Sequence, residues 1–166
     1  RLLAEKGFSI QPVLSENVYA TATRFGSASH LINQVEGICG RSVIHSVVDA
    51  EPLGPAVPLD ALIICPCTGN TLAKMAAGIT DSSVTMAAKA HLRGDRPLVI
   101  ALASNDALSA NLKNIATLLT RKCVYFVPLK QDDPQKKPHS LIADFSLLEP
   151  TLVSAMEGKQ LQKLFV

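Results

Sequence analysis

The order of apolar runs along the chain is the feature that most restricts its fold. Two runs, DALIICP at 60–66 and PLVIALA at 97–103, are continuously apolar rather than alternating in polarity. Continuous runs of this length are typical of central strands that are covered on both faces of a parallel sheet. A helical pattern at 70–92, broken near Gly78, separates them. A strand, a helix and a second strand in this order indicate a βαβ unit.

The same alternation continues on both sides of this unit. The predicted strands are 8–14, 43–48, 60–66, 97–103 and 123–128, and the predicted helices are 26–38, 70–92, 107–121 and 145–157. Hydrophobic residues make up 48% of the chain and aromatic residues only 4%, so the core consists mainly of aliphatic side chains. The sequence therefore predicts an α/β fold, a three-layer doubly wound parallel sheet, in a single domain over residues 1–166.

The first residues predict that this domain is truncated at its N-terminus. RLLAEKG at 1–7 has the pattern of the last turns of an amphipathic helix closed by a C-cap glycine. A predicted strand follows at once at 8–14. We therefore expect an earlier strand and loop to be missing from the chain.

Composition disfavours several classes of function. The net charge is +2, and no Lys/Arg stripe with interleaved aromatic residues is present, so we expect no nucleic-acid partner. No apolar run approaches the roughly 18 residues of a membrane span, and the N-terminus lacks a signal-peptide layout. We expect a cytoplasmic protein with no membrane partner. The chain has no CxxC pair, so we expect no metal site and expect the cysteines to be small buried side chains. They are Cys39, Cys65, Cys67 and Cys123.

Polar residues follow three of the predicted strands, at 15–17 (SEN), 68–71 (TGNT) and 104–106 (SND). In an open α/β sheet, ligands bind beyond the carboxyl ends of the strands, near the N-termini of the following helices. If the strands are neighbours, the three clusters line one cleft. Hydroxyls, amides and helix N–H groups without an obvious general base suit a phosphate or a polyhydroxylated cofactor. Plain N-capping is the alternative, because Ser, Thr, Asn and Asp are the preferred caps.

The histidines and one loop allow further interpretations. His45 lies inside a predicted apolar strand, which favours a satisfied core histidine. His91 and Arg93 close a predicted helix, where cations interact favourably with the C-terminal dipole. The stretch QDDPQKKPHS at 131–140 is either a solvated loop or a lid whose basic residues bind a small acidic substrate.

The stretch PCTGNTLAKMAAGITDS at 66–82 resembles the signature of the flavoprotein superfamily, which includes phosphopantothenoylcysteine decarboxylases and flavin prenyltransferases. In that superfamily a Pro-x-Ser/Thr-x-Asn-Thr turn, followed by Ala-Lys and Gly-x-x-Asp, lines an FMN site. The matching positions are Pro66, Thr68, Asn70, Thr71, Ala73, Lys74, Gly78 and Asp81. Three longer stretches, at 49–93, 104–115 and 125–141, are similar to the B-subunit family of dipicolinate synthases.

This second resemblance implies an oxidoreductase subunit in spore-forming bacteria. It would support the oxidation of a dihydrodipicolinate-level precursor to dipicolinate, together with an A subunit. FMN is the implied cofactor, and NADP enters through the A subunit. A homo-oligomer in the cytoplasm of the mother cell is also implied. Two alternatives stay open: a non-catalytic partner subunit with a vestigial flavin cleft, and a free-standing FMN enzyme acting on another small acid.

The resemblance also implies roles for individual residues, although no catalytic residue is identified. The implied cofactor-binding residues are Ser15, Cys67, Thr68, Asn70, Thr71, Ser104 and Asn105. Among them Ser15 would contact the flavin phosphate, and the backbone around Cys67 would join the ribityl or ring contacts. Lys136 and Lys137 would lie on the substrate side of the cofactor.

The chain departs from the superfamily at two further points. The decarboxylases carry a catalytic histidine shortly before the strand that leads to the Asn-Thr turn, whereas this chain has EPLGPAVP at 51–58. ALASND at 101–106 stands where they have a Pro-x-Met-Asn clamp. Decarboxylation of a cysteine conjugate is therefore a poor interpretation.

Overall fold

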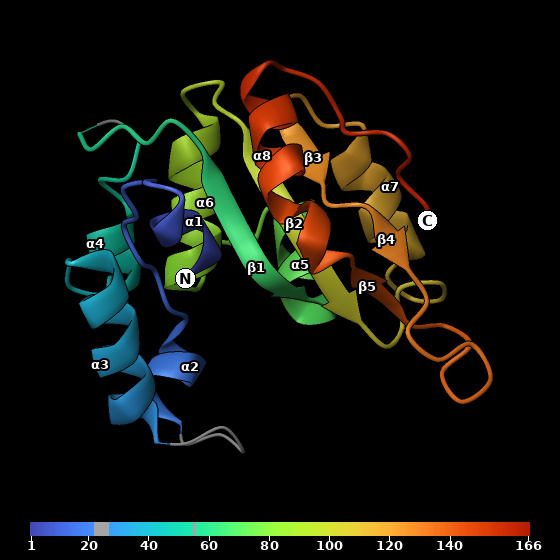
Figure 1. The fold of residues 1–166 in the computed structure, drawn as a ribbon, viewed down its shortest axis with the longest axis horizontal. Helices are drawn as coiled ribbons and strands as arrows, with labels where there is room; N and C mark the ends of the chain where they lie inside the picture. The colour runs from blue at the N-terminus through green and yellow to red at the C-terminus, as the bar shows by residue number, and fades with distance from the viewer. Residues whose placement is uncertain (22–26, 55) are drawn as a thin grey trace.

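A computed structural model describes residues 1–21, 27–54 and 56–166 (Figure 1). Its helices are α1 (Leu2–Glu5), α2 (Glu16–Ala20), α3 (Ala28–Cys39), α4 (Val47–Ala50), α5 (Gly69–Ala76), α6 (Ser83–Leu92), α7 (Leu112–Leu119) and α8 (Leu148–Met156), with a 3-10 turn η1 (Phe145–Leu147). The strands are β1 (Leu62–Thr68), β2 (Leu98–Ser104), β3 (Val124–Phe126), β4 (Leu129–Lys130) and β5 (Leu141–Ala143). Within these ranges no helix is both long and apolar enough to cross a bilayer.

The sheet is centred on β2, as its continuous apolar run predicts. Strand β1 pairs with β2 in parallel on one side, and β3 pairs with it in parallel on the other. The α/β class and the central position of β2 are confirmed. The prediction that the 60–66 run is also a central strand is wrong for the described residues, because β1 pairs only with β2 and lies at the end of the sheet. The end of β2 then pairs with β5 in antiparallel fashion, and β5 pairs with β4 in the same way. The sheet is therefore mixed rather than wholly parallel, because a short hairpin follows the parallel strands.

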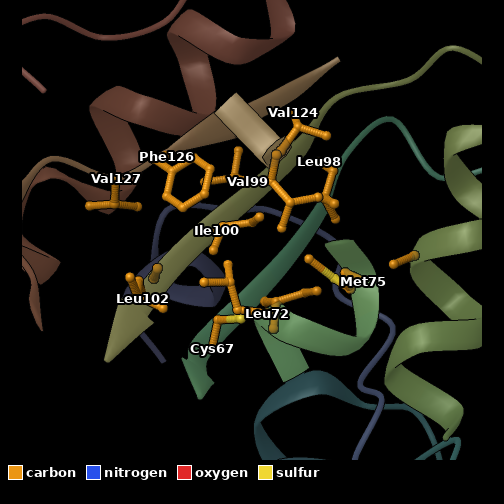
Figure 2. Packing of buried hydrophobic residues seen from close by; sticks show 14 of the residues in the cluster. Cys67, Leu72, Met75, Leu98, Val99, Ile100, Leu102, Val124, Phe126 and Val127 are labelled. Carbon is orange, nitrogen blue, oxygen red and sulfur yellow. The ribbon is translucent and has the colours of Figure 1, made fainter. Parts of the chain in front are cut away.

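Helices cover both faces of this sheet (Figure 1). Helix α8 lies in front of β2 and β3, whereas α5 and α7 pack behind β1, β2 and β3. The core between them consists of aliphatic side chains with one large aromatic residue, Phe126 (Figure 2). Leu98 to Leu102 are completely buried, which agrees with a central strand covered on both faces.

The predicted strands 8–14 and 43–48 are mostly irregular in the structure. They meet in a single parallel bridge between Val13 and Ile44. The Ile44 N–H donates to the Pro12 carbonyl at 3.0 Å, and Leu14 N–H donates to the Ile44 carbonyl at 2.9 Å. Neither segment joins the five-stranded sheet.

Local capping explains why the second of these segments stops early. The Ser46 hydroxyl accepts a hydrogen bond from Asp49 N–H at 3.1 Å and starts helix α4, so residues 47 and 48 are helical. His45 is half-buried and stacks on Tyr19, with ring centroids 3.7 Å apart. The prediction of a core histidine within a strand is therefore wrong, because its ring packs beside α2 instead.

The last seven residues close one edge of the sheet. The side-chain amide of Gln160 acts as a substitute for a neighbouring strand: its Oε1 accepts from Phe126 N–H at 2.8 Å, and its Nε2 donates to the Phe126 carbonyl at 2.7 Å. Further along, Leu129 N–H donates to the Leu164 carbonyl, and Val166 N–H donates to the Leu129 carbonyl. The outer edge of β3 and β4 is thus paired rather than open.

His91 is completely buried in the last turn of α6. Its Nε2 lies 2.9 Å from the Pro97 carbonyl, and its Nδ1 has no hydrogen-bond partner among the described residues. Burial lowers the pKa of this imidazole, outweighing the opposing effect of the Pro97 carbonyl. Burial therefore opposes the predicted role of His91 as a cation favoured by the helix dipole, because it disfavours the charged form.

Stability is expected to fall as the pH drops below about 6.5, where histidine titrates in the unfolded chain. The unfolded state binds the proton first, because the folded-state pKa of His91 is lower, and so acid favours unfolding. His91→Gln keeps an N–H donor for Pro97 but removes the titration, and should flatten this part of the profile. Denaturant unfolding between pH 5 and pH 8 measures the effect. His139→Gln, at an exposed loop position, should leave the slope as it is.

Candidate cofactor site

A β-bulge in β1 determines which side chains reach the surface at the end of this strand. Ile64 pairs with Ile100 and Cys67 pairs with Leu102, so β1 uses three residues where β2 uses two. One extra residue reverses the inside–outside alternation of a strand. Cys67 therefore enters the core, and Thr68 is exposed where the strand meets α5.

The thiol of Cys67 is part of the core. It is fully buried beside Leu72 (Figure 2), and burial raises its pKa to about 12. Only the backbone of Cys67 is therefore positioned for the predicted cofactor contact. Cys65, within the bulge, is exposed, which contradicts the prediction that all the cysteines are buried.

Thr68 is the N-cap of α5. Its Oγ1 accepts a hydrogen bond from Thr71 N–H at 3.3 Å and lies 3.2 Å from the Thr71 hydroxyl. The capping interpretation is thus correct for this pair. Between them, Asn70 is exposed, and its side chain makes no hydrogen bond to another residue in the described ranges. Capping therefore occupies the Thr71 N–H and one lone pair of the Thr68 hydroxyl. The side-chain amide of Asn70 is available to a ligand.

The first residue of α5, Gly69, packs against a polar network after β2. Asp106 Oδ1 accepts hydrogen bonds from the Ser104 hydroxyl at 2.5 Å and from Asn111 Nδ2 at 2.8 Å. A Cβ at position 69 would lie 2.5 Å from Ser104 Oγ and 2.7 Å from Asn111 Nδ2. Only glycine fits, so the N-terminus of α5 and the segment after β2 are locked together. The prediction that 68–71 and 104–106 meet is confirmed.

Two network residues differ in role from the sequence-based expectation. The Ser104 hydroxyl points at Asp106, whereas Asn105 is exposed. Asn111 lies within the predicted helix 107–121, but residues 105–111 form turns and α7 starts only at Leu112. The sequence feature that could have indicated the contact of α5 with Ser104 and Asn111 is Gly69, directly after the Thr68 cap. A glycine at this position allows another segment to approach the helix backbone closely.

The Asp106 carboxylate is held in its charged form. Hydrogen bonds from Ser104 first, and then from Asn111, lower its pKa below the usual range. A carboxylate of this kind is a weak base, so its main effect is to fix the two loops. No group of three or more metal-ligating side chains occurs in the ranges that the structure describes.

Ser15 lies at the same end of the molecule but beside a different helix. Its hydroxyl caps α2 by accepting from Val18 N–H at 3.4 Å. The neighbouring Glu16 carboxylate accepts from Ser83 N–H at 2.9 Å, at the start of α6. Ser15 is therefore anchored near α6 and is not part of the network around Gly69. Its predicted phosphate contact stays a prediction.

Lys74 and Asp81, two residues of the recognised signature, bind each other. Lys74 Nζ lies 2.9 Å from both carboxylate oxygens of Asp81. Between them Gly78 ends the helix with a φ of 73°, which favours glycine. This part of the signature connects α5 to the start of α6. It lies apart from the residues at the ends of β1 and β2, which we call the polar cluster: Thr68, Asn70, Ser104, Asn105, Asp106 and Asn111.

The predicted substrate lysines lie in the loop between β4 and β5, which projects away from the body (Figure 1). Lys137 Nζ binds Asp132 at 2.8 Å, and hydrogen bonds from Lys137 and Ser140 lower the pKa of Asp132 to about 2. The loop is tied to the segment after β2 by Leu108 N–H, which donates to the His139 carbonyl. The structure does not bring Lys136 and Lys137 onto the polar cluster, and their role stays a prediction.

Comparison with known proteins agrees with this architecture. The family model described as Flavoprotein matches residues 1–145. The chain belongs to the Flavoprotein family. Its sequence is 44% identical over 99% of its length to the B subunit of dipicolinate synthase from Bacillus subtilis (strain 168), of which the match covers 82%. The resemblance stated from the sequence is thereby confirmed.

Solved structures place the chain in the same family. The crystal structure of the dipicolinate synthase B subunit from Bacillus halodurans superimposes with a TM-score of 0.91 at 42% identity, covering 99% of this chain and 85% of that one. The FMN-dependent cysteine decarboxylase SpaF gives a TM-score of 0.57 at 27% identity, with 77% and 74% of the two chains covered. The first similarity extends over the whole described chain, including the polar cluster.

Proposed function

We propose that this chain binds FMN at the polar cluster and serves as the B-type subunit of a dipicolinate synthase. It would support the oxidation of a dihydrodipicolinate-level precursor to pyridine-2,6-dicarboxylate, together with an A-type subunit. The observation that carries the proposal is the locked junction of Gly69 with Ser104 and Asn111. It holds an exposed hydroxyl and amide at the carboxyl ends of two neighbouring strands, in a chain similar to that subunit over 99% of its length.

The residues present fit a flavin. Thr68, Asn70 and Asn105 are exposed at this edge, and they offer neutral hydroxyl and amide groups of the kind that ribityl hydroxyls and ring carbonyls require. A charged carboxylate, Asp106, lies behind them, where Ser104 and Asn111 already bind it. When bound, FMN supplies the hydride-accepting chemistry needed to remove two hydrogens from a dihydropyridine ring.

The chain itself would bind and orient. Asn70 and Thr68 hold the cofactor, and the network behind Gly69 keeps them in place without reorganisation. Lys136 is the better candidate for a substrate carboxylate, because its amino group makes no ion pair with another described residue, whereas Lys137 already binds Asp132. An NADP-dependent step would belong to the A subunit.

Flavin binding by the full-length protein tests the proposal. The purified protein should show a flavin absorbance spectrum or acquire one on titration with FMN. Asn70→Ala should raise the Kd for FMN about three- to tenfold, because one neutral hydrogen bond contributes roughly 0.5–1.5 kcal/mol. Asn33→Ala, at an exposed position of α3 remote from the cluster, is the matched control and should leave the Kd unchanged.

A protein that stays colourless at millimolar FMN would rule out the cofactor role. Equal Kd values for Asn70→Ala and Asn33→Ala would show that the flavin binds elsewhere. Thermal unfolding of both variants without FMN checks that neither substitution alters the fold.

One observation favours a second candidate, a non-catalytic partner of the A subunit. The carboxylate at the cluster, Asp106, is bound by Ser104 and Asn111 and has a lowered pKa, so it is a poor proton acceptor. Assay of the A subunit alone and with this chain separates the two candidates. Dipicolinate formation by the A subunit alone, accelerated but not made possible by this chain, would support the partner role.

A further inference from the structure

A small pocket of about 200 Å³ lies between α5, α6 and α7, at the start of β2. Its inner lining consists of buried side chains from four elements: Met75, Thr85, Ala88, Leu98 and Leu118. Two of them, Met75 and Leu98, are seen in Figure 2 at the same side of the core. Because packed helices and the sheet hold these side chains, the inner part of the pocket is formed before any ligand arrives.

The inner surface of this pocket is apolar. Thr85 carries its one polar side chain, and that hydroxyl is already engaged at the start of α6. It donates to the Ser82 carbonyl at 3.1 Å and accepts from the Ser82 N–H at 3.2 Å. An apolar cavity of about 150 Å³ is known to stay dry and to bind benzene. The pocket here has room for one six-membered ring.

Two cations stand at the mouth of the pocket. Lys89 of α6 and Arg121, just after α7, both line it and are both exposed. Neither side chain makes an ion pair or a hydrogen bond with another residue in the described ranges. The carboxylates nearest to them along the chain, Asp81 and Asp95, are bound by other lysines at 2.9 Å and 2.6 Å. The positive charge at the mouth is therefore not neutralised by the protein.

We propose that this pocket is a second ligand site, which binds a small aromatic carboxylate. The ring would lie among Met75, Ala88 and Leu118, and the carboxylate would lie between Lys89 and Arg121. A guanidinium group binds both oxygens of a carboxylate through parallel hydrogen bonds. The thioether of a methionine also makes favourable contacts with an aromatic ring.

Other classes of ligand use only part of this arrangement. Inorganic phosphate would pair with the two cations but would leave the apolar interior unfilled. A neutral ring would fill the interior but would leave Lys89 and Arg121 without a partner, and a cationic ligand would be repelled by them. Only a molecule with one anionic end and one apolar ring matches both parts.

The pocket is separate from the polar cluster. Helix α5 begins beside that cluster at Gly69, and Met75 near its other end lines the pocket. The eight residues of this helix, at 1.5 Å per residue, place about 12 Å between its two ends. The second site therefore goes beyond the proposed flavin function and does not depend on it.

Methyl NMR of the full natural protein tests the proposal with benzoate as the probe. Residues 1–166 contain three methionines, and of these Met75 lines the pocket, whereas Met86 and Met156 do not. With methyl groups labelled in methionine, titration with benzoate into the millimolar range should shift the Met75 signal until it saturates. The signals of Met86 and Met156 should stay in place. No flavin is present, so failure here leaves the proposed function untouched.

Two further probes separate the contributions of the ring and the charge. Benzamide has the same ring without a charge, and acetate has the charge without a ring. Each should bind at least about tenfold more weakly than benzoate. For benzamide the reason is that hydrogen bonds to a charged group contribute about a factor of ten or more. For acetate it is the loss of the buried ring.

Three variants with the same change in net charge provide the matched test. Lys89→Gln and Arg121→Gln should each raise the Kd for benzoate about three- to tenfold, because each removes one cation from the mouth. Arg93→Gln removes an exposed cation one turn further along the chain, outside the lining, and should leave the Kd unchanged. All three positions are exposed, and thermal unfolding checks that the variants stay folded.

Three outcomes would overturn the proposal. Equal Kd values for benzamide and benzoate would make the pocket a site for neutral apolar molecules. Equal effects of Arg93→Gln and Lys89→Gln would reduce the binding to general attraction by positive charge. A Met75 signal that does not respond to benzoate, or responds only when the protein is diluted, would show that the pocket is closed or covered by a second copy of the chain.

Discussion

Gly69→Ala is expected to lower the free energy of unfolding by about 1–3 kcal/mol, the usual range for overpacking. The new Cβ would lie 2.5 Å from Ser104 Oγ, 2.7 Å from Asn111 Nδ2 and 3.0 Å from Asp106 Oδ1. All three atoms belong to one hydrogen-bonded network, so none moves without breaking a bond to another. Urea unfolding followed by circular dichroism measures the change.

Gly37→Ala is the matched control for this substitution. Gly37 lies inside α3, where an added Cβ would meet nothing within 4 Å. Alanine is favoured over glycine in a helix interior by about 0.5–1 kcal/mol, so this variant should be more stable than the parent. If Gly69→Ala also proved stabilising, the locked junction would not exist as described. If the flavin proposal holds, Gly69→Ala should weaken FMN binding, whereas Gly37→Ala should leave it unchanged.

Gln160→Ala should lower the free energy of unfolding by about 2–3 kcal/mol. The substitution removes both partners of Phe126, whose N–H and C=O groups bond to the same amide. Unpaired buried backbone groups cost roughly 1–3 kcal/mol each, and partial access of water reduces that sum here because Gln160 is half-buried. Gln135→Ala, at an exposed loop position, should change stability by less than about 0.5 kcal/mol.

Gln160→Glu distinguishes loss of hydrogen bonds from loss of packing. A carboxylate accepts from Phe126 N–H but has no proton to donate to the Phe126 carbonyl, whereas the protonated acid does both. The folded state therefore favours the neutral form, and the folded-state pKa of the new residue should exceed its unfolded value. Relative to the parent, this variant should gain stability as the pH falls from 7 toward about 4.3. A constant difference between variant and parent across that range would contradict the strand-substitute role of Gln160.

The fold was predictable where long-range pattern determines it. The continuous runs at 60–66 and 97–103 identified β1 and β2 as strands, although only β2 is covered on both faces, whereas β1 lies at the end of the described sheet. Strands β4 and β5 were missed because they span two and three residues on either side of a charged loop. The predicted strand at 43–48 failed because capping by Ser46 is a local event that outweighs an apolar run.

The site was predictable to the extent that it follows from topology. Strand ends at one edge of a sheet meet, so 68–71 and 104–106 were expected together, and they are in contact. The part played by Asn111 was hidden, because its contact with Asp106 depends on turns that replace the first part of the predicted helix. Lys74 and Asp81 stood out as signature residues, yet their pairing is visible only in three dimensions.

The bulge in β1 means that position, more than residue type, selects the chemistry presented by this turn. Removal of one residue at 65 or 66 would make the alternation regular from Ile64 to Cys67 and would leave the thiol inside and the Thr68 hydroxyl outside. A strand of the present length that paired without the bulge would instead turn the thiol of Cys67 outward and the hydroxyl of Thr68 inward, with every letter of the motif intact. A reactive sulfur would then replace a neutral donor at the mouth of the cluster. Two relatives that share the letters of this turn but differ in whether the strand is bulged would thus offer different surfaces to the same ligand.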